Sequence, residues 1–129
     1  MIKMYTDAAT KGNPGPTGLG VLIIDQHNQQ QLSMPVSRAT NHEGEFLAAI
    51  HGFQYLLDHY DHQQTILYYT DSRLLSDAIA KNYSKHYQNL LNQLNQLVNQ
   101  ETMVVTRWIP EKDNHGAHHL ANQALHQVE

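Results

Sequence analysis

The sequence predicts an α/β fold in which helices flank both faces of a five-stranded mixed sheet. Short apolar runs of strand length alternate with longer segments of helical hydrophobic period, and three strand-like runs precede the first helix-like segment. Strands that follow one another directly can pair antiparallel, whereas parallel pairing needs a crossover connection such as a helix. We therefore expect three antiparallel strands and then two parallel ones. A chain of 129 residues can bury one core, so we expect a single domain over residues 1–129.

Three strands are predicted before residue 40. Residues 2–6 and 19–24 are apolar and rich in β-branched side chains, as buried strands are. Residues 25–28 have the composition of a hairpin turn. The run that follows, residues 31–36, contains Pro35, which an edge strand tolerates because its amide positions can face solvent. We expect this third strand at the edge of the sheet.

The remainder of the chain predicts helices separated by two further strands. Thr40 and Glu43 have the spacing of a capping box at the start of a helix from about residue 42 to residue 59. Residues 65–70 form the next predicted strand, and a short helix follows it. Leucines at helical spacing predict a longer helix over residues 90–98, and the chain then predicts a last strand and a last helix over residues 102–109 and 117–128.

Composition excludes several kinds of chemistry. The chain has no cysteine, so disulfides, thiolate zinc sites and thiol nucleophiles are absent. No apolar run is long enough to cross a membrane, and the N-terminal residues do not resemble a secretory signal, so we expect a cytoplasmic protein. The formal net charge of −4, with only 8 Lys and Arg, predicts modest affinity for nucleic acid. Ten histidines can add positive charge below neutral pH.

An aspartate, Asp7, follows the first predicted strand, and a Gly-Asn-Pro-Gly run at residues 12–15 follows it in turn. A run of this kind makes a tight turn in any protein. It does not explain an aspartate at the end of an apolar strand. Residues 6–16 together resemble the ribonuclease H family, in which this stretch supplies the first metal-binding aspartate and a loop beside the RNA strand.

Two further stretches resemble the same family. Residues 40–49 resemble its helix with the catalytic glutamate, and the apolar residues that follow align Glu45 with that position and leave Glu43 as the cap. Residues 66–72 resemble its strand that ends in Thr-Asp-Ser, with Asp71 as the shared ligand. Taken singly, Glu45 fits an ordinary first-turn acid, and either Asp71 or Ser72 fits a helix N-cap. The three matches in order imply that Asp7, Glu45 and Asp71 are catalytic metal ligands.

The resemblance implies an endonuclease that hydrolyses the RNA strand of RNA–DNA hybrids and leaves 5′-phosphate and 3′-hydroxyl ends. Three carboxylates in one pocket would repel one another unless cations lay between them. Mg²⁺ or Mn²⁺ is the implied cofactor, with two ions expected when substrate is bound. The implied partner is the hybrid, with no membrane and no second subunit, so we expect a monomer.

The resemblance also implies substrate contacts. Gly12, Asn13, Thr40 and Asn41 correspond to positions near the 2′-hydroxyls and bases of the RNA strand, and Arg73 is placed for a minor-groove or phosphate contact. For Asn41 a helix-capping side chain is an equally good interpretation.

The sequence departs from the family pattern at one ligand. Residues 108–121 resemble the last strand, loop and helix of the family, but His118 stands where an aspartate is expected. We predict His118 as a fourth catalytic ligand that binds weakly and favours Mn²⁺ over Mg²⁺. Activity is then weak or manganese-dependent. The alternative is a catalytically impaired protein that binds hybrid, RNA or a protein partner. A relative acting on DNA fits less well, because the Gly-Asn and Thr-Asn elements belong to the hybrid-specific branch. The basic protrusion of some relatives is also missing, with only residues 81–85 in its place.

Overall fold

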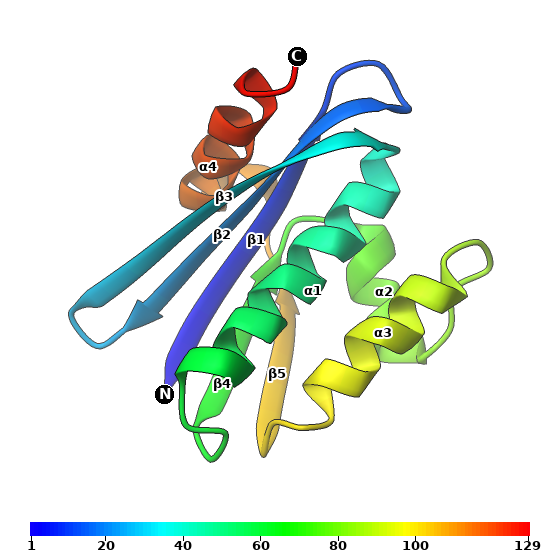
Figure 1. The fold of residues 1–129 in the computed structure, drawn as a ribbon. Coiled ribbons are helices and arrows are strands. Elements are labelled where there is room, and N and C mark those ends of the chain that lie inside the picture. The colour runs from blue at the N-terminus through cyan, green and yellow to red at the C-terminus, as the bar shows by residue number, and fades with distance from the viewer.

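Five strands form one mixed sheet in the order β3-β2-β1-β4-β5 in the computed structural model, which describes residues 1–129 (Figure 1). β2 pairs antiparallel with both β1 and β3, whereas β4 is parallel to β1 and β5 is parallel to β4. The predicted arrangement of three antiparallel and two parallel strands is confirmed. The bounds of the strands are β1 (Ile2–Thr10), β2 (Gly15–Asp25), β3 (Asn28–Ala39), β4 (Thr65–Thr70) and β5 (Met103–Trp108).

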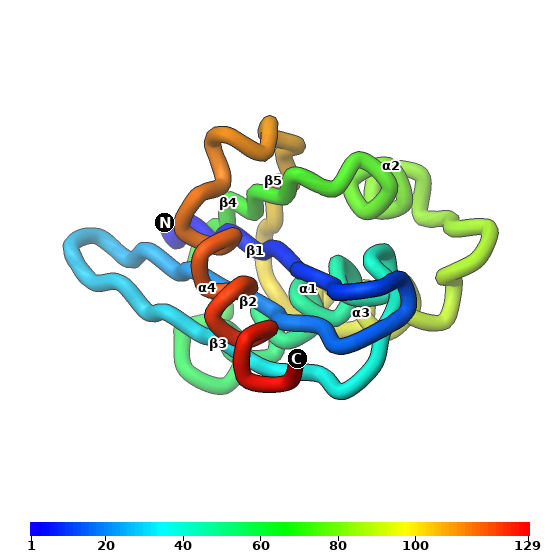
Figure 2. The backbone as a smooth tube through the Cα atoms, turned by 90° about the horizontal axis from the view of Figure 1, so that it is seen from above, coloured from blue at the N-terminus to red at the C-terminus, as the bar shows by residue number.

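Helices cover both faces of this sheet, as predicted. α1 and α3 lie in front of the sheet in Figure 1, and α4 lies behind it. Figure 2 shows the β2–β3 hairpin and the connection from α2 to α3 at opposite ends of the molecule. No helix is both long enough and apolar enough to span a bilayer. The helices are α1 (Asn41–His59), α2 (Arg73–Lys81), α3 (Gln88–Val98) and α4 (His115–His126), and a short 3₁₀ helix, η1 (Glu111–Asp113), precedes α4.

β1 is longer than the sequence predicted, and the difference places the site. The apolar run ends at Thr6, but β1 continues to Thr10 because residues 7–10 keep pairing with β2. Pairing of β1 with β4 stops where Thr6 meets Thr70. Asp7 therefore lies inside β1, at the first position that β4 no longer covers, rather than at the end of a strand.

α4 lies directly on the backbone of β2 because two glycines leave room for it. A methyl group added at Gly18 would lie 2.0 Å from the carbonyl oxygen of Ala121, and one at Gly20 would lie 2.2 Å from the carbonyl oxygen of Ala117. Both distances are far below van der Waals contact, and both neighbours are helix backbone. These glycines therefore fix the height of α4 above the sheet.

Gly20→Ala is expected to lower the free energy of unfolding by about 1–3 kcal/mol, because α4 would have to move off the sheet. Urea denaturation measures the change. The matched control is Gly116→Ala in α4, where the added methyl group would meet only the tip of the Leu22 side chain. That control is expected to be neutral or to stabilise by up to about 1 kcal/mol through helix propensity. Equal destabilisation by both variants would contradict this account.

The predicted capping box starts α1. The Thr40 hydroxyl accepts from the backbone amide of Glu43 at 3.1 Å, and the Glu43 carboxylate accepts from the backbone amide of Thr40 at 2.9 Å. Below this turn, Phe46 and Phe53 are buried against the sheet, with Tyr68 of β4 in edge-to-face contact with Phe53. Cap and core together fix where the first turn of α1 begins, and with it the position of Glu45.

Candidate active site

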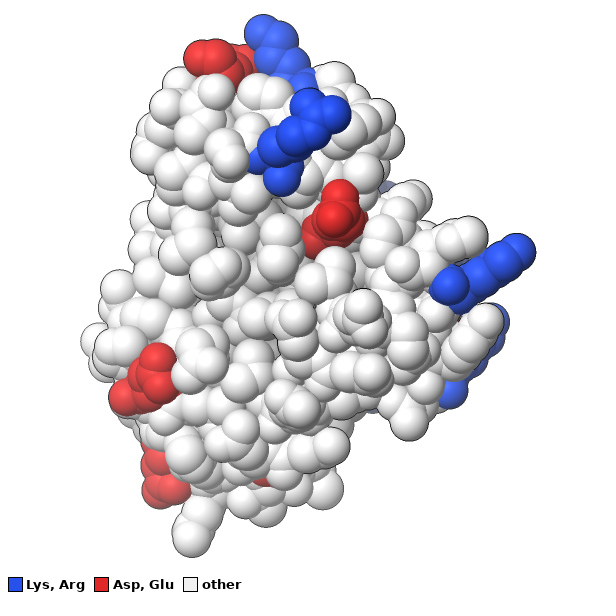
Figure 3. All heavy atoms as spheres, turned by 45° about the vertical axis from the view of Figure 1, so that its right-hand side comes forward, with Lys and Arg blue, Asp and Glu red and all other residues white.

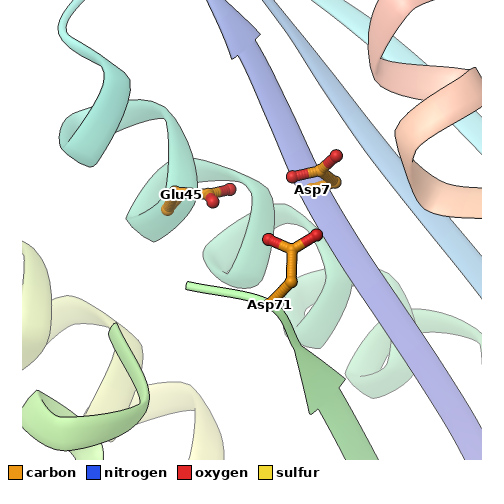
Figure 4. A group of neighbouring side chains, drawn as sticks. All are labelled: Asp7, Glu45 and Asp71. Atoms are coloured by element: carbon orange, nitrogen blue, oxygen red, sulfur yellow. The ribbon is translucent and has the colours of Figure 1, made fainter. Parts of the chain in front are cut away.

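Three acidic side chains from separate elements meet at the carboxyl end of β4. Asp7 comes from β1, Glu45 from the first turn of α1 and Asp71 from the residue after β4 (Figure 4). One carboxylate oxygen from each lies within 4.8 Å of the others. Asp7 is 4% exposed and Glu45 is 9% exposed, whereas Asp71 is half-buried. The structure therefore gathers the three predicted ligands in one pocket.

Strand pairing and close packing account for this convergence. Thr6 and Thr70 are partners in the parallel ladder, so the next residues, Asp7 and Asp71, leave it side by side. Glu45 reaches them because Gly44, just before it, has no side chain. A methyl group there would lie 2.9 Å from the Cβ of Ala8, so only glycine lets α1 lie this close to β1.

Helix α2 begins two residues after Asp71, at Arg73, and Asp71 is not its cap. The Ser72 hydroxyl accepts from the backbone amide of Leu75 at 3.1 Å and caps the helix. At α1, likewise, Thr40 supplies the capping side chain, not Asn41. The capping interpretations of Asp71 and Asn41 are therefore wrong, and the Asp71 carboxylate is left free to face Asp7 and Glu45.

Burial opposes ionisation of all three acids, and repulsion from neighbouring acids in the pocket adds to this effect at Asp7 and Glu45. Burial, and then the charge of Asp71, raises the pKa of Asp7 to about 6, although hydrogen bonds from His118 and the Ala8 amide oppose this rise. Burial raises the pKa of Glu45 well above its usual range, and the charges of Asp7 and Asp71 add to the effect. Burial also raises the pKa of Asp71. A divalent cation between the carboxylates would favour their ionised forms.

The donor set suits a hard cation. All three close groups are carboxylates, and Mg²⁺ and Mn²⁺ prefer oxygen ligands. A fourth polar atom beside them lacks a partner: the Oδ1 atom of Asn114 is buried and accepts no hydrogen bond. The three carboxylates fit a hydrated divalent ion, which binds oxygen ligands and keeps several waters.

Two side chains at the start of α4 support the pocket. The Nδ2 atom of Asn114, a residue only 1% exposed, donates to the carbonyl oxygen of Thr6 at 2.9 Å and to Asp71 at 3.2 Å. The Nδ1 atom of His118 lies 2.9 Å from Oδ2 of Asp7. His118 is not one of the three mutually close ligands. Its predicted role as a fourth metal ligand stays a prediction.

Two asparagines near the acids were not among the residues predicted from the sequence. They are Asn114 and Asn122, and the Nδ2 atom of Asn122 lies 3.0 Å from Nε2 of His118. Each of these two asparagines has a sequence feature that could have identified it. Asn114 is the residue just before α4, where an asparagine usually caps a helix, but its side chain makes no capping bond. Asn122 stands four residues after His118, the spacing that places two side chains together on a helix.

Four of the predicted substrate residues lie in the β1–β2 loop and at the start of α1, and the fifth, Arg73, is the first residue of α2. Asn13 and Asn41 are joined by a hydrogen bond. The Asn13 side-chain oxygen accepts from the backbone amide of Asn41 at 2.8 Å. This bond ties the loop that holds Gly12, whose φ is +72°, to the start of α1. Their contacts with substrate, and that of Thr40, stay predictions.

The side chain of Arg73 lies over the Trp108 ring, next to Asp71. Its guanidinium carbon lies 3.8 Å from the centre of the Trp108 ring, and the Trp108 indole N–H donates to the carbonyl oxygen of Asp71 at 3.0 Å. Both side chains are exposed. The face in Figure 3 is mostly uncharged, with basic groups at its upper end and right edge and acidic groups at its upper end, in its upper middle and at its lower left. Arg73 is therefore a fixed cation close to the acidic pocket.

Comparisons with known proteins agree with this geometry. A family profile described as "Reverse transcriptase-like" matches residues 5–124. The chain is 39% identical over 127 residues to EbsB of Enterococcus faecalis, and the match covers 97% of this chain and 94% of EbsB. The name of EbsB describes it as a hydrolase and gives no substrate. It is 36% identical over 87 residues to a ribonuclease H of Trichodesmium erythraeum, covering 67% of this chain and 53% of that enzyme. The match thus spans about half the length of that ribonuclease H.

Solved structures resemble the whole chain. LC11-RNase H1 in complex with an RNA/DNA hybrid has a TM-score of 0.90 and 25% identity, with 99% of each chain covered. RNase H1 from the halophilic archaeon Halobacterium salinarum has a TM-score of 0.90 at 23% identity, with 98% of each chain covered. At this identity the similarity supports the fold alone.

Proposed function

Because the chain belongs to the ribonuclease H-like family, we propose that it hydrolyses the RNA strand of RNA–DNA hybrids with divalent metal held by Asp7, Glu45 and Asp71. The observation that supports this most is the close approach of the three carboxylates, which burial and repulsion make unfavourable without a cation. Mg²⁺ and Mn²⁺ are the proposed cofactors, with two ions in the presence of substrate. The cytoplasmic location, monomeric state and single-domain organisation stay predictions.

Each residue of the pocket has a proposed role that follows from its position. The bound metal would supply Lewis-acid stabilisation and an activated water for in-line attack on the scissile phosphate. Asp7, Glu45 and Asp71 would hold that metal at the carboxyl end of β4, and Asn114 donates a hydrogen bond to the carboxylate of Asp71. The expected products carry 5′-phosphate and 3′-hydroxyl ends.

Selection of RNA is assigned to the surface beside the pocket. The loop at Gly12 and Asn13, joined to Thr40 and Asn41 at the start of α1, presents backbone and amide groups for 2′-hydroxyls. DNA lacks these hydroxyls, so a strand of DNA in the same place would lose the contacts. Arg73 supplies a cation for a phosphate or the minor groove.

A second candidate function is binding without efficient catalysis. Replacement of the fourth acid by His118 favours it, as does the long match with EbsB, whose name gives no substrate. In this case the pocket binds metal and hybrid but hydrolysis is slow.

One assay separates the two candidates. Purified protein is incubated with a hybrid labelled on its RNA strand, in Mg²⁺ and separately in Mn²⁺, beside duplex RNA, duplex DNA and a hybrid labelled on its DNA strand. Cleavage of only the RNA strand of the hybrid, with 5′-phosphate ends, is the expected result. Binding of hybrid without cleavage in either metal would favour the second candidate. Cleavage of duplex DNA would refute the proposed substrate.

Arg73→Ala is expected to raise KM for hybrid about fivefold to tenfold with little change in kcat, because it removes a fixed cation and no metal ligand. If Arg73 contacts a phosphate, the slope of log KM against log salt should also fall by about one. Trp108→Phe keeps an aromatic face under the guanidinium and should show a smaller effect. Lys81→Ala, which removes an exposed cation at the far end of α2, is the matched control. An unchanged salt slope in Arg73→Ala would exclude a phosphate contact.

A further inference from the structure

His118 has both of its ring nitrogens engaged. Nδ1 lies 2.9 Å from Oδ2 of Asp7, and Nε2 lies 3.0 Å from Nδ2 of Asn122, one turn further along α4. His118 is 43% exposed at its side chain, whereas the Asp7 side chain is 6% exposed. A half-buried imidazole therefore bridges a buried carboxylate and an amide on its own helix.

The donors and acceptors of this bridge fix one arrangement of hydrogens. The Asn122 amide nitrogen is a donor, so Nε2 of His118 accepts. Nδ1 of a neutral imidazole then carries the hydrogen and donates it to Oδ2 of Asp7. Neither ring nitrogen has a lone pair left for a metal.

We propose that His118 positions Asp7 instead of ligating metal, as the middle member of a relay that runs from Asn122 through His118 to Asp7. This inference rests on the proposed metal site. The relay commits Oδ2 of Asp7 to His118 and leaves Oδ1 to face the cation, and it fixes the rotation of the carboxylate. Partners that hold a ligand in this way typically contribute about 10- to 100-fold in metal affinity.

The backbone beneath the relay is held rigidly. Ala117 and Ala121, which flank His118 along α4, are fully buried, and α4 rests on the backbone of β2 at Gly20. The same helix offers an internal comparison. His119 and Gln123 form an equivalent pair four residues apart, with 3.3 Å between their side-chain nitrogens, but both are exposed. Only the His118 pair reaches a carboxylate of the pocket.

Nitrogen-15 NMR of the histidine rings tests the relay without any nuclease assay. The expected spectrum shows His118 with its hydrogen on Nδ1, and this tautomer persists when Mg²⁺ is added to saturation. Ligation through Nδ1 requires the hydrogen on Nε2 instead. A switch to that tautomer on addition of Mg²⁺ would overturn the proposal.

Paired substitutions give the second readout, the dissociation constant for Mn²⁺ measured by calorimetry. His118→Asn places an amide N–H near the position of Nδ1 and is expected to stay within about twofold of wild type, whereas His118→Gln and His118→Ala lose about tenfold. Asn122→Ala should keep the Nδ1–H tautomer, which the hydrogen bond to Asp7 also favours, and should lose less affinity than His118→Ala, whereas His119→Ala should match wild type. Equal loss in His118→Asn and His118→Ala would argue against the relay.

These results can be told apart from failure of the proposed nuclease function. If hybrid is not cleaved but the tautomer and the affinities behave as expected, the relay holds and the substrate is wrong. If hybrid is cleaved but the tautomer switches with Mg²⁺, His118 is a ligand and the relay is wrong.

Discussion

Asp71→Asn is expected to lower the single-turnover rate of hybrid cleavage by about 10³-fold, since loss of a metal-binding carboxylate removes several kcal/mol of transition-state stabilisation. Asparagine has nearly the same shape, and its side-chain oxygen can still accept from Asn114. The fold should therefore survive, and the effect should fall on chemistry. Quench-flow or gel analysis with enzyme in excess over labelled hybrid measures the rate.

Asp77→Asn is the control for this experiment. It makes the same chemical change in an exposed acid on α2, six residues further along the chain. Its rate should equal that of wild type. A wild-type rate in Asp71→Asn, purified in the same way, would show that the activity comes from another site or from a contaminating nuclease.

Much of the site was predictable because it depends on local patterns. Asp71 follows an apolar strand, and Glu45 lies two residues beyond Glu43 in a capping-box helix, so the elements that carry them could be predicted from local pattern, whereas their role as ligands came from the resemblance to ribonuclease H. Parallel pairing of β1 and β4 then brings Asp7 and Asp71 together. The prediction that these acids converge with Glu45 is confirmed by their mutual distance.

The surroundings of the acids were not predictable, because they depend on how elements pack. The continuation of β1 past Asp7 follows from pairing with β2, which a polar stretch of sequence does not reveal. The contacts of Asn114 and His118 depend on the height and angle of α4 above the sheet, which Gly18 and Gly20 set. Residues with ordinary surface character in the sequence thus become partners of the metal-binding acids.

The metal-free protein is expected to lose stability as pH rises from about 4 to about 7, and Asp7→Asn should remove part of this loss. The pKa of Asp7 in the folded protein is about 6, against an ordinary value of 3.8. Below about pH 3 the group is largely protonated in both folded and unfolded chains, so it has little effect. As pH rises, the unfolded chain ionises first, and folding becomes less favourable by up to about 3 kcal/mol. Glu45, whose pKa is also raised, contributes in the same direction.

Comparison of wild type with Asp7→Asn isolates this effect, since the other titrating groups are shared. In EDTA the variant should be about as stable as wild type at pH 3 and more stable by a few kcal/mol at pH 7, with chemical denaturation as the measurement. Mg²⁺ should reverse the order at pH 7, because binding to the folded state stabilises wild type by RT ln(1 + [Mg²⁺]/Kd), and the variant has lost a ligand. A full difference that is already present at pH 3, or that Mg²⁺ does not alter, would mean that the ionisation of Asp7 in this pocket is not its cause.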